Sequence, residues 1–213
     1  MITRTFLVLP IGSIFALAAC GGSSSNPVDA FALYDAFDAA REGAGNSGGA
    51  YSAANVLPSG TASFDGVISV FETDGTDSPF SGSSDDQVFG AFGSVSLTAN
   101  FDAGTVTGDA TGFREYDVSD PFVNDDFVGP DIGALEGEFA INSVIDTSNG
   151  LAEIGGDITG NLQRADGTTA NFDFDVTQGG FTETDKLYLN IFAVGDAGFD
   201  DDGVTAGAVI FAE

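Results

Sequence analysis

Acidic residues dominate the composition: this chain of 213 residues has 33 Asp and Glu against 5 Lys and Arg, no histidine, and a formal net charge of −28. Such a charge repels nucleic acids and anionic lipid, so we expect neither to bind the folded domain. Without histidine, neither a Ser-His-Asp nor a Cys-His system can form, and zinc and copper lose their commonest ligand. Paired carboxylates remain chemically available, but acidic residues are too abundant for one pair to stand out. We therefore expect no enzyme and no transition-metal site.

The chain begins with the pattern of a bacterial secretory signal. Arg4 precedes the uncharged run "TFLVLPIGSIFALAA", which Pro10 and Gly12 interrupt and which is too short to span a membrane comfortably. Its end, Leu17-Ala18-Ala19-Cys20, resembles a lipobox, whose cysteine receives a diacylglycerol and becomes the mature N-terminus. We expect residues 1–19 to be removed and Cys20 to be lipidated. The alternative is an ordinary signal peptide followed by an incidental cysteine.

The residues after Cys20 extend this interpretation. Gly21 rather than aspartate follows the cysteine, which indicates onward export and an anchor in the bacterial outer membrane, on its cell-surface or periplasmic face. Residues 20–27 contain "GGSSSN" and are predicted to form a flexible spacer between lipid and domain. Because Cys20 is the only cysteine, its lipidation leaves no disulfide and no free thiol. Several acyl chains together hold a protein firmly at a membrane.

Residues 28–43, "VDAFALYDAFDAAREG", predict a short helix. Asp29 is suited to cap its start, Gly43 to end it, and an apolar side is expected from Phe31, Leu33, Tyr34 and Phe37. Residues 44–59 are predicted to be a linker.

A literal GxGxxG occurs at Gly43, Gly45 and Gly48. It follows a helix, whereas a dinucleotide site needs it between a strand and the helix that it opens. We interpret it as part of the linker.

From residue 60 to 213 the pattern changes to apolar and polar residues in alternation. Val95, Leu97, Ala99 and Phe101, for example, are expected on one face, and Ser94, Ser96 and Thr98 on the other. The predicted strands are 61–71, 88–101, 104–113, 134–145, 151–163, 168–179, 186–195 and 203–213. Short turns between most of them favour an all-β domain, an eight-stranded antiparallel up-and-down β-barrel. Its outward positions carry Asp, Glu and Asn, so we expect a soluble barrel rather than a transmembrane one.

Three segments of this region are similar to a known family. They are "LPSGTASFDGVISV", "SVSLTANFDAGTVTGDATGF" and the terminal "GVTAGAVIFAE". They resemble the barrel domain of transferrin-binding protein B-like bacterial lipoproteins; the residues that match are Gly60, Phe64 and Gly66 in the first segment and Phe101, Gly104, Val106 and Gly108 in the second. The resemblance covers residues 57–213 and implies an eight-stranded barrel. The family's transferrin receptors have two lobes, each with a handle domain, so transferrin binding does not carry over to a single barrel.

The segment 114–133, "REYDVSDPFVNDDFVGPDIG", is long for a barrel turn, and long loops in compact domains are often functional. It combines aromatic and acidic residues that we take as candidate contacts for a ligand or partner: Tyr116, Phe122 and Phe127, with Asp117, Asp120, Asp125 and Asp126. Exposed aromatic groups mark contact surfaces, and the aspartates favour a cationic partner. The alternative is an acidic loop with no specific role.

The segment 195–203, "GDAGFDDDG", is rich in the oxygen ligands that calcium prefers. In an EF-hand loop the glycine stands at position six. If Gly203 takes that position, however, positions one and twelve are Gly198 and Val209, which cannot supply side-chain oxygens. A weak Ca²⁺ site is therefore the one cofactor left open.

Together these patterns predict a lipoprotein whose soluble barrel binds a protein or a small solute, in nutrient or iron-source acquisition for example. A structural or adhesive envelope lipoprotein without a specific small ligand is the alternative. We expect a monomer that meets the membrane only through its lipid.

Overall fold

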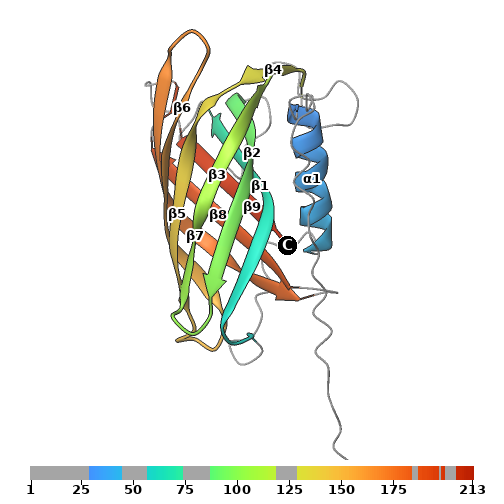
Figure 1. The fold of residues 1–213 in the computed structure, drawn as a ribbon. Coiled ribbons are helices and arrows are strands. Elements are labelled where there is room, and N and C mark those ends of the chain that lie inside the picture. The colour runs from blue at the N-terminus through green and yellow to red at the C-terminus, as the bar shows by residue number, and fades with distance from the viewer. Residues whose placement is uncertain are drawn as a thin grey trace, which may run out of the picture.

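The computed structural model describes residues 29–44, 57–73, 87–118, 129–183, 187–196, 198–199 and 205–213. Its elements in chain order are α1 (Ala30–Gly43), β1 (Thr61–Thr73), β2 (Gln87–Asn100), β3 (Thr105–Tyr116), β4 (Asp131–Ala134), β5 (Glu136–Asp146), β6 (Glu153–Gln163), β7 (Thr169–Glu183), β8 (Leu187–Asp196) and β9 (Thr205–Ala212). The strands form one antiparallel sheet in the order β2-β1-β9-β8-β7-β6-β5-β3-β4 (Figure 1). Because β2 also pairs with β3, the sheet closes on itself. The prediction of an eight-stranded antiparallel barrel is confirmed, with β4 as a short addition.

The strands differ most from the predicted ones at two places, and at the other ends the bounds shift by no more than three residues. β4 has only four residues and pairs with the end of β3, so it lacks a period long enough to be recognised. β7 continues to Glu183, four residues beyond the predicted end at Gly179. A register shift between Val176 and Gln178 in its pairing with β8 lets the strand pass through its two glycines without losing its neighbour.

The barrel interior is filled with apolar side chains. Val95, Leu97 and Ala99 are buried inside, as predicted, and the intervening serines and threonine of β2 are exposed. Phe172 and Phe174 are also buried, and their rings stack with centroids 5.6 Å apart. Phe101 lies at the edge of this core: it is half-buried in a turn, 5.3 Å from the ring of Phe181.

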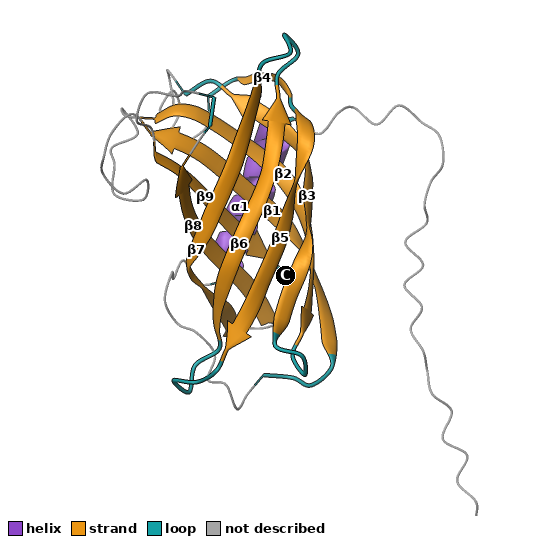
Figure 2. Ribbon diagram, turned by 90° about the vertical axis from the view of Figure 1, so that its left-hand side faces the viewer, coloured by secondary structure: helices purple, strands orange, loops and turns teal. Residues whose placement is uncertain are grey.

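Helix α1 lies along the outside of the barrel, where it covers a second apolar surface (Figures 1 and 2). Leu33 packs against Val67 of β1 and Phe92 of β2, and the ring of Phe37 lies 5.2 Å from that of Phe211 in β9. The helix therefore explains why β9 is buried on both faces: Ala206, Ala208, Ile210 and Ala212 belong to the interior, whereas Val209 and Phe211 lie beneath the helix.

The start of α1 at Asp29 and its end at Gly43 agree with the prediction: the Asp29 side chain accepts a hydrogen bond from the Ala32 amide. Of the expected apolar side, Leu33 is buried and Tyr34 and Phe37 are half-buried. The expectation for Phe31 is wrong, because its side chain is 42% exposed and small alanines complete the buried face instead. Within the described residues, no helix has the length and hydropathy needed to cross a membrane.

The two ends of the barrel differ. At one end, which we call the loop end, the segments 74–86, 117–130, 164–168 and 197–204 join the strands. At the other, the turn end, the strands are joined by 101–104, 147–152 and 184–186. Helix α1 begins beside β4 at the loop end (Figure 1), where the Ala30 amide binds Asp131, and finishes at the turn end, where Gly43 lies against Tyr188.

Candidate functional site

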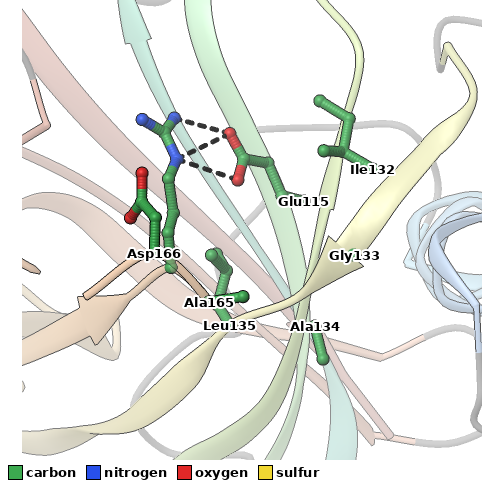
Figure 3. Close-up of a pocket in the computed structure, with 8 residues that line it drawn as sticks. Glu115, Ile132, Gly133, Ala134, Leu135, Ala165 and Asp166 are labelled. Carbon is green, nitrogen blue, oxygen red and sulfur yellow. Dashed lines mark hydrogen bonds and ion pairs between the residues drawn. The ribbon is translucent and has the colours of Figure 1, made fainter. Parts of the chain in front are cut away.

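A pocket of about 380 Å³ opens at the loop end, between β4 and the turn that joins β6 to β7 (Figure 3). It forms because the sheet forks there. Gly133 of β4 pairs with Glu115 of β3, whereas Glu136, the first residue of β5, pairs with Gln163 at the end of β6. The pocket occupies the space that this divergence leaves, and it is lined by Glu115, Ile132, Gly133, Ala134, Leu135, Arg164, Ala165 and Asp166.

An ion pair forms the inner wall of the pocket (dashed lines in Figure 3). The Nε atom of Arg164 lies 3.0 and 3.1 Å from the two carboxylate oxygens of Glu115, and Nη2 lies 2.5 Å from Oε1. The guanidinium carbon is also 4.1 Å from the ring centroid of Phe199, a cation–π distance. The hydrogen bonds to Glu115 raise the pKa of Arg164 above its ordinary value, so this cation is permanent.

Arg164 also compensates a second carboxylate that points into the barrel. Glu72 of β1 is fully buried, and its Oε1 accepts a hydrogen bond of 2.8 Å from the Phe199 amide. Its negative charge acts on Arg164 as well. Buried carboxylates are costly unless a cation neutralises them. Arg164 therefore lies at the mouth of the barrel between the Glu115 carboxylate and the Phe199 ring, and its ion pair separates the pocket from the buried Glu72.

The outer walls of the pocket are acidic on one side and apolar on the other. Asp166 is exposed, and its Oδ1 accepts a hydrogen bond of 2.8 Å from the Thr168 amide, which holds the pKa of Asp166 below its usual value. Ile132 is 60% exposed, whereas Leu135 is buried. Two carboxylates and one guanidinium leave the lining net negative. Such a pocket is suited to a cationic group attached to a short apolar chain.

Tyr116 does not take part in this site. Its side chain is only 5% exposed and lies on the outer face of the barrel, stacked on Phe92 with centroids 5.2 Å apart. Its hydroxyl accepts a hydrogen bond of 2.8 Å from Gln87, and burial raises its pKa to about 12. The expectation that Tyr116 offers an exposed aromatic contact is wrong, because α1 and its neighbours cover this face.

Asp117 lies in the segment 114–133, which the sequence analysis selected as a candidate contact region. Its amide donates a hydrogen bond of 2.8 Å to the carbonyl of Pro130. The other candidate contacts lie outside the described residues and remain predictions; they are Asp120, Phe122, Asp125, Asp126 and Phe127. Cys20 lies outside the described residues too.

Asp131, near the end of the same segment, has a structural role. It accepts hydrogen bonds from Arg114 at 3.0 and 2.7 Å and from the Ala30 amide at 2.8 Å, and so ties α1 to the barrel.

Sequence reasoning missed Arg164, Asp166 and Ile132 as site residues, since "RADG" is typical of a plain turn. The signal that could have identified Arg164 is the small number of basic residues in the chain. The chain has 5 basic residues against 33 acidic ones, so each basic residue has many potential partners. All three described arginines are in fact paired: Arg41 with Asp38, Arg114 with Asp131, and Arg164 with Glu115.

The described part of the chain holds no group of three or more acidic, histidine or cysteine side chains that could bind a metal. Most of the segment 195–203 lies outside it, so the weak Ca²⁺ site stays a prediction.

Comparison with protein-family models, with curated proteins and with solved structures found no match to this chain. The barrel fold is shown by the structure. The resemblance to transferrin-binding protein B-like lipoproteins remains a prediction from the sequence motifs.

Proposed function

We propose that this protein is an outer-membrane lipoprotein, anchored through Cys20, whose barrel is a binding module for a ligand with a cationic group. The ligand contacts the loop end, in the pocket beside Arg164. The observation that carries this proposal is the filled interior. Small barrels of eight strands are just wide enough for their own side chains, and here phenylalanines occupy the centre, so the contact surface belongs outside the barrel.

Charge supports the cationic group. The pocket lining is net negative, and the whole chain has a formal charge of −28. Such a field attracts cations from a distance and speeds their approach more than it tightens their binding. Salt screens this attraction, so binding should weaken as the ionic strength rises. Ile132 and Leu135 would cover the apolar part of the ligand.

Gly133 offers a direct test of the pocket. Because it pairs with Glu115, a side chain at this position would lie on the same face of the sheet as the ion pair. A Cβ there would meet no atom within 4 Å, and the backbone does not have a positive φ. Gly133→Leu should therefore fill the pocket without strain. Gly155 of β6 also has open space around it and lies away from the pocket, so Gly155→Leu is the matched control.

The probes are butylguanidinium and, as an anion of similar length, pentanoate. We expect butylguanidinium to shift the amide NMR signals of 132–135 and 164–166 in the wild-type protein and in Gly155→Leu. The shifts should be lost in Gly133→Leu and should shrink with added salt. Equal shifts in Gly133→Leu, or equal binding of pentanoate, would contradict the proposal. A protein that binds neither probe would favour the structural envelope role.

A further inference from the structure

The direction of α1 fixes the end of the barrel from which the N-terminal segment leaves. The Ala30 amide is bound to Asp131 at 2.8 Å, and Asp131 is the first residue of β4, at the loop end. The next turns of the helix are held by aromatic contacts, with the Phe37 ring 5.6 Å from that of Phe92 and 5.2 Å from that of Phe211. The start of the helix is therefore fixed to the rim that carries the pocket.

The chain between the proposed anchor and this point is short. Nine peptide bonds join Cys20 to Asp29, which span at most about 32 Å when fully extended. A flexible chain of this length has a root-mean-square span of about 17 Å. The barrel itself is about 30 Å long, from strands of some 12 residues that rise about 3.3 Å each and tilt by about 40°.

We propose that the loop end faces the membrane and that the turn end points away from it. This inference rests on the proposed lipid anchor at Cys20. The lipid excludes the barrel from one half of the space around its tether, so the tethered end stays near the lipid surface and the other end lies farther away on average. The pocket beside Arg164 then lies within reach of the lipid surface.

Two exposed alanines in tight turns, Ala165 at the loop end and Ala103 at the turn end, provide matched labelling sites. Each is changed to cysteine in the lipidated protein, where acylation leaves the introduced thiol as the only reactive one. The labelled proteins are reconstituted into phosphatidylcholine vesicles that contain a lipid with an acceptor dye on its headgroup. We expect energy transfer to be several-fold stronger for Ala165→Cys than for Ala103→Cys. Insertion of a long Gly/Ser segment after Ser25 should reduce this difference.

Equal transfer from the two sites, or stronger transfer from Ala103→Cys, on a protein that sediments with the vesicles would overturn the orientation and leave the anchor intact. A protein that stays in the supernatant would overturn the anchor, and the orientation with it. The lengthened spacer distinguishes a tether effect from adsorption of one end to lipid, because adsorption would leave the difference unchanged and would also contradict the proposal.

Discussion

Asp131 accepts a hydrogen bond from the Ala30 amide, with 2.8 Å between the nitrogen and Oδ2, although the two residues are 101 positions apart in the sequence. The same carboxylate binds the guanidinium of Arg114, which lies on the outer face of β3. One side chain thus joins the first turn of the helix, the short strand β4 and the barrel wall. The attachment of α1 depends on this contact as well as on its apolar face.

Asp131→Asn should therefore weaken the domain. The change removes the charge that both hydrogen-bond donors face and leaves Arg114 without its ion-pair partner, which we expect to lower the free energy of unfolding by about 1–3 kcal/mol. Urea denaturation measures this loss. Asp109→Asn, at an exposed position on β3, is the control and should change stability by less than about 0.5 kcal/mol. Equal effects of the two substitutions would show that the contact contributes nothing specific.

The same residue makes the stability of the protein depend on pH. Burial alone would raise the pKa of Asp131, but the hydrogen bonds from Arg114 and Ala30 and the charge of Arg114 outweigh it and lower the pKa. The unfolded chain, with an aspartate pKa of about 3.9, then takes up this proton more readily than the native state does. The contribution of Asp131 is present above about pH 4 and is lost as the pH falls through the folded pKa. The stability difference between wild type and Asp131→Asn should shrink over that acid range, and a difference that stays constant would contradict the assignment.

Tyr116 should be slow to ionise when the protein is titrated with base. Its pKa is raised to about 12 by burial, against a partial opposing effect of the hydrogen bond from Gln87. Ultraviolet absorbance at the phenolate band should show a tyrosine step near this value, and Tyr116→Phe should remove the contribution of Tyr116 to it. Because the folded pKa is raised, the contribution of Tyr116 to stability is present below its unfolded pKa and is lost as the pH rises through the folded value. A step that persists undiminished in Tyr116→Phe would assign it to another tyrosine.

The phenylalanines should differ in how much each one contributes to the free energy of unfolding. Phe174 is fully buried and contacts Phe139 and Phe172, so Phe174→Ala should reduce the free energy of unfolding by about 3–5 kcal/mol. Phe101 is half-buried at the turn end, and Phe101→Ala should reduce it by less. Phe31→Ala, on the exposed side of α1, is the control and should change it by less than about 0.5 kcal/mol. Chemical denaturation gives all three values, and a loss at Phe31 equal to that at Phe174 would mean that the buried faces have been assigned wrongly.

Cys20→Ser should release the protein from the bacterial envelope. If Cys20 carries the acyl chains, its loss removes the membrane anchor and leaves a soluble acidic domain. Fractionation of cells followed by immunodetection measures the distribution. Ser23→Ala, in the spacer, should leave the protein with the outer membrane. A Cys20→Ser protein that still sediments with outer membranes would refute the lipidation.

The sequence by itself determined the barrel. Alternation with a period of two, interrupted by short turns, requires paired strands with one apolar face, and closure is the way for such a sheet to lose its edges. The inward positions of β2 and of Phe172 and Phe174 follow from this alternation alone. The cap at Asp29 and the end at Gly43 follow from local hydrogen bonding, which needs no tertiary partner.

Only the tertiary structure decided what lies outside the barrel and at its mouth. Val209, Phe211 and Tyr116 all face away from the interior of the barrel. They are buried because α1 packs over the outer face of the strands that carry them. Arg164 pairs with Glu115, 49 residues away in the sequence, because β3 and β6 both pair antiparallel with β5 and therefore end at the same rim. Such contacts join segments that are distant in the sequence, so no local period or spacing encodes them; they exist because the pairing of the strands fixes where each strand ends.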